Sequence, residues 1–350
     1  MRFFCMVLWL GALAGSLAGQ GPLSDTQQKF ATELAATFQN LEKKNAAAGA
    51  GVDDWLFFAG ELRLLSLGHF WGDDARKVSR AHRPELADPI PAIVDFHQQL
   101  KARGIELLVV PVPPKAAIYP EKIVPGFDVR SHDPAPTLHR FYDELRAAGI
   151  DVLDLSPLLI QNRDHARGAV FCKTDSHWSG IGCVLAAHAI AEKIRPKLQQ
   201  ASGAKGYVAD WKEAQVSGDL ARLLPPDARK PGPEKIALQS VSEKGTGAAV
   251  EPDPNSPLLL LGDSHTLVYH DRDFLPEHAG LFDQLALQLG FAADLIGTSG
   301  SGATPVRINL YRRSLKDPGY LARKKVVVWC FAAREFTEAT EGWAKAPIAK

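Results

Sequence analysis

Residues 258–266 read LLLLGDSHT, and this stretch decides the fold that we expect. Four consecutive leucines bounded by turn residues are typical of a strand buried on both faces of a parallel sheet. Gly262 permits a tight turn after that strand, so Ser264 would stand at the carboxyl edge of the sheet, where α/β proteins hold their active sites. Gly-Asp-Ser is also a common turn tripeptide, so this stretch alone leaves an ordinary surface turn open.

The rest of the chain repeats this pattern of short apolar runs and amphipathic segments. Glycine ends several of the helical segments, as expected for helix C-termini. Strands alternating with helices predict a three-layer, flavodoxin-like α/β fold, in which a parallel sheet has helices on both faces. The expected strands are 54–58, 105–110, 150–153, 257–261, 293–296 and 325–329, and the expected helices are 24–41, 91–103, 137–148, 180–194 and 281–289.

Residues 202–253 break the pattern because they are rich in proline, glycine and charge, and we interpret them as a long irregular insertion. The expected organisation is a signal peptide, an N-terminal helical segment, one main domain that contains the insertion, and a C-terminal tail. These parts cover residues 1–18, 19–50, 51–336 and 337–350.

The first 18 residues carry the marks of a secretory signal. Arg2 precedes an apolar run over residues 3–13, and Ser16-Leu17-Ala18 then gives the small-x-small pattern of a cleavage site. A retained N-terminal anchor is the alternative. Later stretches are too short or too polar to cross a bilayer, so we expect an exported chain in the periplasm or cell envelope. Forty basic residues balance 40 acidic ones, and this charge gives no reason to expect a nucleic-acid partner.

The cysteines indicate neither a metal site nor a disulfide framework. After signal removal, Cys172, Cys183 and Cys330 remain. In an oxidising compartment Cys172 and Cys183 are close enough in sequence to pair, while Cys330 lies in an apolar run typical of a buried free thiol. The sequence leaves that disulfide open. No Cys/His spacing of a zinc site is present, so we expect no metal.

Residues 173–180 read KTDSHWSG and offer partners for a serine nucleophile. A nucleophilic serine needs a base, and that base needs a carboxylate to hold its tautomer. Asp175 and His177 lie two residues apart before a predicted helix, which allows both side chains to project from the same side of an extended loop. Trp178 would shield them from water. Alternatively, Asp175 is a helix cap and His177 a surface residue.

Four motifs in this order resemble the SGNH hydrolase-like domain of the alginate O-acetyltransferase family, of the AlgJ/AlgX type. They are GVDDWLF at 51–57, TDSHW at 174–178, GDS at 262–264 and VVWCFAAR at 327–334. The resemblance implies a triad of Ser264, His177 and Asp175. It departs at Asp54, where the family more often has glycine, and the chain leaves no room for the carbohydrate-binding module of the AlgX type.

Further site residues are less sharply indicated. Beside the Ser264 amide, Gly300 and Gly302 in a glycine-rich loop could supply an oxyanion N–H, although an ordinary flexible loop is the alternative that we favour. Arg334 could hold a ligand, but we favour a structural ion pair. We treat the remaining candidate histidines as non-catalytic, with His265 in reserve as a base; they are His69, His97 and His265.

The expected reaction is acetyl transfer to a polysaccharide hydroxyl through an acetyl-serine, without a cofactor. The resemblance implies a membrane-bound O-acyltransferase as the donor partner. Two alternatives stay open: a carbohydrate acetyl-esterase with the same triad and water as acceptor, and a non-catalytic glycan-binding scaffold. The polymer itself is left open by the zero net charge.

Overall fold

The computed structural model describes residues 22–198 and 206–350, so the predicted signal peptide lies outside the described residues. A five-stranded sheet in the order β4-β3-β9-β7-β8 forms the centre, and all its pairs are parallel, as predicted. The strands are β3 (Glu106–Val112), β4 (Asp151–Val152), β7 (Leu258–Gly262), β8 (Asp294–Gly297) and β9 (Val326–Ala332).

Strands β7 and β9, in the interior of the sheet, are hydrophobic because both of their faces are covered. Every residue of β7 and β9 is buried, and burial of each large side chain contributes about 1.5–3 kcal/mol. Val328 of β9 pairs with Leu260 on one side and Leu108 on the other. The leucine run therefore ends inside the carboxyl edge, between β9 and β8.

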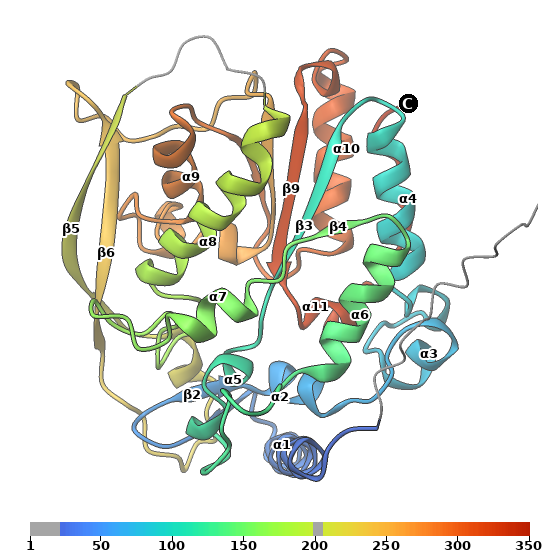
Figure 1. The fold of residues 1–350 in the computed structure, drawn as a ribbon, viewed down its shortest axis with the longest axis vertical. Coiled ribbons are helices and arrows are strands. Elements are labelled where there is room, and N and C mark those ends of the chain that lie inside the picture. Colours follow the sequence, from blue (N-terminus) through green and yellow to red (C-terminus); the bar gives the residue numbers. More distant parts are fainter. Residues whose placement is uncertain (1–21, 199–205) are drawn as a thin grey trace, which may run out of the picture.

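Helices cover both faces of this sheet, which confirms the three-layer prediction. Figure 1 shows α8 and α9 on one face and α4, α6 and α10 on the other. The helices are α1 (Asp25–Lys43), α2 (Ala59–Ser66), α3 (Ala75–Val78), α4 (Ile90–Lys101), α5 (Lys115–Ile118), α6 (Pro136–Ala147), α7 (Ser156–Gln161), α8 (Gly180–Ile194), α9 (Leu281–Leu289), α10 (Thr304–Lys316) and α11 (Glu335–Glu338). The sequence analysis predicted α1, α4, α6, α8 and α9; it did not predict the remaining helices, which are α2, α3, α5, α7, α10 and α11.

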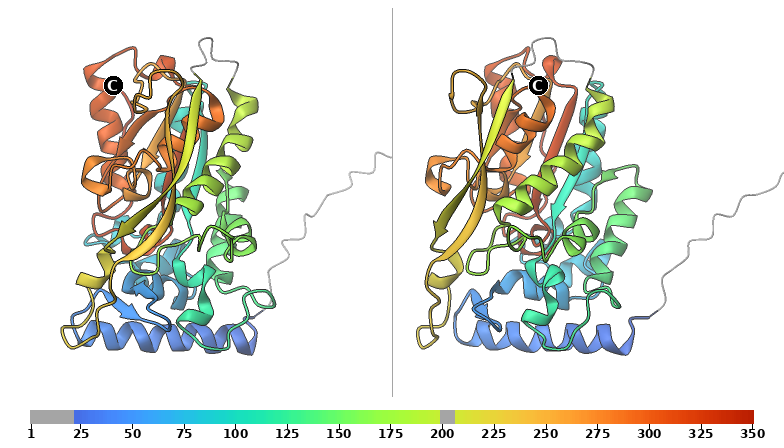
Figure 2. Two further views of the ribbon diagram at one scale, coloured as in Figure 1. Left: turned by 90° about the vertical axis from the view of Figure 1, so that its left-hand side faces the viewer. Right: turned by 60° about the vertical axis from the view of Figure 1, so that its left-hand side comes forward.

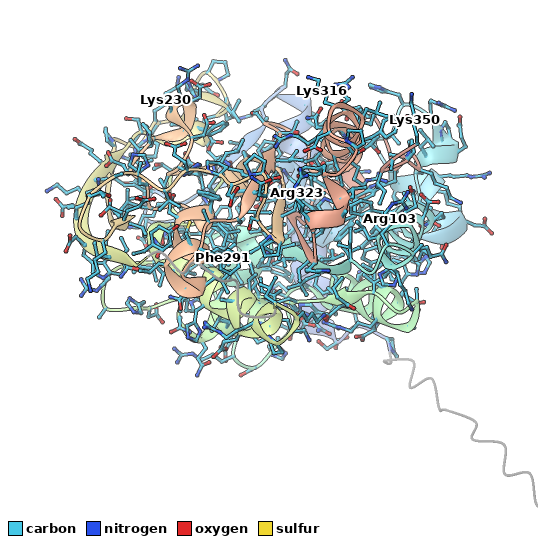
Figure 3. The ribbon with its side chains drawn as sticks, turned by 90° about the horizontal axis from the view of Figure 1, so that it is seen from above. Arg103, Lys230, Phe291, Lys316, Arg323 and Lys350 are labelled. Atoms are coloured by element: carbon cyan, nitrogen blue, oxygen red, sulfur yellow. The ribbon has the colours of Figure 1, made fainter. Side chains whose placement is uncertain are left out.

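The amino and carboxyl ends of the parallel strands form two edges of the sheet, and different elements lie next to each. At the amino edge the helices of the outer layers end, and Figure 3 looks onto this edge with Arg103 after α4 and Lys316 at the end of α10. Basic side chains there complement the negative ends of the helix dipoles. Helix α1 runs below the carboxyl edge, toward which the arrows of β3 and β9 point (Figures 1 and 2).

The prediction of an irregular insertion was wrong. Residues 207–243 contain a two-stranded antiparallel ribbon of β5 (Tyr207–Val216) and β6 (Glu234–Glu243), paired over ten residues each. The ribbon packs on α8 and α9 (Figure 2). Gly180 permits this contact, because a Cβ there would lie 2.4 Å from the carbonyl oxygen of Ala237. One face of the ribbon stays exposed, so its strands lack the continuous apolar runs of the central sheet.

The N-terminal segment is helical, as expected, and continues into a small hairpin. Strands β1 (Ala48–Ala50) and β2 (Leu56–Phe58) pair in antiparallel fashion. The turn between them holds Asp53 and Asp54 at φ values of 55° and 66°. Glycine adopts this conformation more readily than aspartate, so a glycine would fit position 54 without backbone strain.

The C-terminal tail is fixed to the core rather than loose. Trp343 and Ile348 are buried, and the Ile348 amide donates to Oε1 of Gln99 on α4 at 3.0 Å. The three described cysteines are buried free thiols. The possible disulfide between Cys172 and Cys183 is therefore not formed; the Cys172 Sγ instead lies 3.1 Å from the hydroxyl of Tyr269. Among residues 22–198 and 206–350, no helix combines the length and apolar character that a bilayer crossing requires.

Candidate active site

The structure brings together the three residues that the sequence placed in a triad. The Nε2 of His177 lies 2.8 Å from Oγ of Ser264, and its Nδ1 lies 2.6 Å from Oδ1 of Asp175. Both distances are hydrogen bonds. Although 87 residues separate Ser264 from His177, their side chains meet at the carboxyl edge of the sheet. This is the geometry of a nucleophile, a base and an orienting carboxylate.

Ser264 follows directly from the leucine strand. It begins a short 3₁₀ turn after β7, and Asp263 ties this turn to the neighbouring strand because its Oδ2 accepts from the Ala332 amide at 2.7 Å. A Cβ on Gly262 would lie 1.8 Å from the carbonyl oxygen of Cys330. Glycine is therefore required for the approach of the two strand ends, which fixes where Ser264 stands.

The loop that carries Asp175 and His177 is held by the connection between β5 and β6. Oδ2 of Asp175 accepts from the Asp219 amide at 3.0 Å, and the Asp219 carboxylate accepts from both the amide and the hydroxyl of Ser176. Gly218 makes this approach possible, since a Cβ there would lie 2.0 Å from the Thr174 carbonyl oxygen. The segment predicted to be irregular thus supplies a donor to the Asp175 carboxylate and two acceptors for the neighbouring Ser176.

A cavity of about 270 Å³ opens at the triad. It lies between the end of the ribbon and the segment that follows the nucleophile. Side chains from both segments face it, so the ribbon also shapes the space available to a substrate. The lining residues are Asp175, His177, Gln215, Val216, Ser217, Asp219, Arg222, Val268, Tyr269, Asp273, Phe274 and Leu275.

Comparison with known proteins identifies the domain. The sequence profile of the family described as "SGNH hydrolase-like domain, acetyltransferase AlgX" matches residues 49–332. The chain belongs to this family.

Relatives of this AlgX-type domain agree with that assignment. The probable alginate O-acetylase AlgJ of Pseudomonas aeruginosa is 29% identical over 83% of this chain and 71% of its own length. The AlgJ of Pseudomonas putida is 25% identical over 86% and 73%.

Two solved structures share the fold. The O-acetyltransferase domain of Pseudomonas putida AlgJ has a TM-score of 0.61 and 23% identity, with 83% of this chain and 92% of that chain covered. Pseudomonas aeruginosa AlgX has a TM-score of 0.56 and 18% identity, with 91% and 71% covered.

Charge in the AlgX-type site is distributed as a serine nucleophile requires. Burial alone would lower the pKa of His177, but the hydrogen bond and negative charge of Asp175 outweigh burial and raise it. Burial likewise opposes ionisation of Asp175, yet the contacts with His177 and the Asp219 amide hold its pKa below the usual range. Asp175 is therefore ionised and His177 is a stronger base than usual.

These shifts predict the pH dependence of nucleophilic attack. His177 accepts a proton only when neutral, so the rate of acetyl-enzyme formation should rise with pH through the pKa of this residue. Because that pKa is raised, the midpoint should lie above about 6.5, the ordinary value for histidine. Stopped-flow release of 4-nitrophenol from 4-nitrophenyl acetate measures this profile, and a midpoint below the ordinary value would contradict it.

Lys115 is a supporting residue that sequence analysis missed. It lies at the start of α5 and is 1% exposed. Its Nζ donates to the carbonyl oxygens of Leu56, Lys173 and Asp175 at 2.8, 3.2 and 2.6 Å. One buried side chain therefore joins the N-terminal hairpin to two residues of the loop that carries the triad carboxylate. Lys115 follows Val112, Pro113 and Pro114 in the sequence. These neighbours give no local sign that the lysine is buried or that it binds three carbonyl oxygens.

Replacement of Lys115 by methionine should destabilise the AlgX-type domain. Each buried acceptor that loses its donor costs ~1–3 kcal/mol, and some of the three carbonyls keep other partners, so we expect a loss of roughly 3 kcal/mol in the free energy of unfolding. Urea denaturation measures this loss. Lys29→Met is the control, because the Lys29 side chain is 78% exposed. Equal effects of the two substitutions would refute the anchoring role.

The other predicted site residues lie around the nucleophile turn. Gly302 packs against Asp263, since a Cβ on it would lie 3.2 Å from both the Asp263 amide nitrogen and Cβ. Gly300 has a φ of 94° and lines two other cavities. An oxyanion role for either amide stays a prediction. Arg334 lies 3.1 Å from Glu61 in an ion pair and stacks over the Phe58 ring, which is the structural role that we favoured.

The aromatic and histidine candidates take supporting positions. Trp178 is fully buried, and its ring stands edge-on to His265 at 5.4 Å, so it packs behind the histidines instead of covering the cavity. The Nδ1 of His265 bonds to Asp263 at 3.1 Å, and burial lowers its pKa. His69 pairs with Asp74, and His97 lies on α4.

Proposed function

We propose that this protein is an exported O-acetyltransferase that acetylates hydroxyl groups of a polysaccharide through an acetyl-Ser264 intermediate. The observation that carries the proposal is the continuous hydrogen-bonded chain from Asp175 through His177 to Ser264, at 2.6 and 2.8 Å. These hydrogen bonds occur in a domain of an acetyltransferase family. The triad geometry supports Ser264 as the nucleophile, and membership of an acetyltransferase family supports acetyl as the transferred group.

In the proposed first half-reaction, Nε2 of His177 takes the proton from Oγ of Ser264 as this oxygen bonds to the acetyl carbonyl carbon. The negative charge on the carbonyl oxygen faces backbone amides, for which Ser264, Gly300 and Gly302 are candidates. The bond to the donor oxygen then breaks, and His177 returns the proton to that leaving oxygen. Acetyl-Ser264 and the deacetylated donor result.

In the second half-reaction a sugar hydroxyl takes the place of the leaving group. His177 accepts the hydroxyl proton, the sugar oxygen attacks acetyl-Ser264, and Ser264 recovers its proton from His177. Asp175 stays ionised and stabilises the imidazolium in both halves. Every step uses this chain's own side chains and needs no cofactor.

The proposed acceptor is an extracellular polysaccharide, in agreement with the alginate O-acetylase names of the relatives. The proposed acetyl source is a membrane-bound O-acyltransferase, and the proposed location is the periplasm, reached through the predicted signal at residues 1–18. Alginate is the first acceptor to test.

Acetyl partition between acceptors tests this function against its alternatives. The purified protein is incubated with 4-nitrophenyl acetate and either mannuronate or neutral hexose oligosaccharides, and both acetylated sugar and free acetate are measured. A transferase should acetylate the oligosaccharide in preference to water. Free acetate alone would make the protein an acetyl-esterase, and glycan binding without any acetyl-enzyme would leave only the scaffold function.

A further inference from the structure

A second cluster of side chains that could bind a metal ion lies between the Ser264 turn and the start of α9. His270 and His278 bracket a short loop, and Asp283 lies in the first turn of α9. One potential ligand atom from each residue lies within 4.8 Å of the other two. The triad reaction described above uses none of these three side chains, and sequence spacing gave no reason to expect them together.

We propose that His270, His278 and Asp283 form a binding site for a divalent transition cation such as Zn²⁺. Two imidazoles and one carboxylate are a common ligand set for this class of ion. Nδ1 of His270 already lies 3.0 Å from Oδ1 of Asp283. Tetrahedral zinc with bonds of about 2.0 Å separates two ligand atoms by about 3.3 Å, so the cation could replace this hydrogen bond with little movement.

The surroundings of Asp283 and His278 favour such a site. The Asp283 side chain is fully buried, and its Oδ2 accepts from the Gly280 amide at 3.0 Å. This contact orients the carboxylate, whose Oδ1 and Oδ2 lie 3.0 and 3.2 Å from the His270 Nδ1. The Nδ1 of His278 is buried and, within the described part of the chain, has no hydrogen-bond partner. Coordination would satisfy an atom that is otherwise costly to bury.

The backbone around His278 is also held in place. Its carbonyl oxygen accepts from the Val241 amide of β6 at 2.8 Å, and the Ser240 hydroxyl donates to the Glu277 carbonyl oxygen at 2.6 Å. The ribbon thus positions one ligand, and the start of α9 positions another. Two firmly held ligands lower the ordering cost of binding a cation.

The cation would fasten the loop that forms one wall of the triad cavity. Asp273, Phe274 and Leu275 lie between the two histidines and line this cavity. The Phe274 ring faces the edge of His177 with a centroid distance of 6.3 Å. The effect on acetyl transfer rests on the proposed function, whereas the cation site itself does not depend on it.

Binding to the full-length, tag-free protein tests the site directly. Isothermal titration with Zn²⁺ and visible absorption with Co²⁺ should show one bound ion per chain. His270→Gln and His278→Gln should each weaken binding at least roughly tenfold, since loss of even an outer-shell partner of a metal ligand costs ~10–100-fold. His188→Gln is the matched control, because the His188 side chain is 58% exposed on α8 and pairs only with Glu192 among the described contacts.

A second variant separates this site from the triad. Asp175, His177 and Asp219 also bring ligand atoms within 4.8 Å of one another, so His177→Gln is titrated in parallel. Binding kept in His177→Gln and lost in His278→Gln supports the proposal. The reverse pattern would assign the ion to the triad and overturn it, as would the absence of saturable binding by the wild-type chain up to roughly 1 mM Zn²⁺.

Limited proteolysis provides a readout that is independent of activity. Arg272 is exposed inside the loop and is a trypsin site. Zn²⁺ should slow cleavage after Arg272 in the wild-type chain and leave the cleavage rate of His278→Gln unchanged. Equal protection of both proteins would refute the fastening of the loop. Acetyl-enzyme formation with 4-nitrophenyl acetate is measured separately, so failure of the metal site leaves the proposed triad testable by itself.

Discussion

Replacement of Ser264 by alanine is expected to abolish the acetyl-enzyme. After exposure to 4-nitrophenyl acetate, the wild-type chain should gain the mass of one acetyl group, whereas the variant should gain none. Loss of a serine nucleophile lowers turnover by roughly 10⁶-fold in enzymes that use such a triad, and we expect a comparable loss of acetyl transfer. The reason is that the variant lacks the hydroxyl that His177 contacts at 2.8 Å, so no oxygen is in place to attack the acetyl carbon.

The control is a serine outside the site. Ser131 is exposed and bonds to Asp128, so Ser131→Ala should be acetylated like the wild type. Removal of the Ser264 hydroxyl should leave the fold intact, because the turn is held by Asp263 through the Ala332 amide. If Ser264→Ala still carries a stable acetyl group on the same tryptic peptide, another residue is the nucleophile.

Asp175→Asn should lower the rate of acetyl-enzyme formation by about 10⁴-fold, the size of effect that loss of the triad carboxylate produces through the wrong histidine tautomer. Asp175 accepts from the ring and amide of His177 and from the Asp219 amide. An asparagine has one acceptor oxygen for these donors, and its NH₂ group would oppose an N–H. His177 would then present a proton, not a lone pair, to Ser264.

The same substitution should shift the pH profile downward. In the wild-type chain Asp175 raises the pKa of His177 against the effect of burial; without its charge, burial prevails and the pKa falls. The residual rate should therefore reach its plateau at a lower pH. Asp143→Asn, on the exposed face of α6, should change neither rate nor profile. An unchanged midpoint in Asp175→Asn would show that another group governs the pH dependence.

The central layers of this protein were predictable because their signals are local. The Leu258–Leu261 run, the Val326–Val328 run and the helices at 180–194 and 281–289 each carry their periodicity within about ten residues, and the structure places them as expected. The ribbon was missed for the opposite reason. Its ten-residue strands are half exposed, and the prolines and glycines between them dominate the composition.

The sequence by itself determined the strand that delivers Ser264, the loop that joins Asp175 to His177, and the expectation that they form one site. Only the tertiary structure decided what holds that site: the Lys115 ammonium, the Asp219 amide and the cluster of His270, His278 and Asp283. Hydrophobic periodicity depends on residues that are neighbours in the chain, so it can be recognised from the sequence alone. A buried polar contact depends on groups dozens of residues apart, and its partners become visible only when the chain has folded.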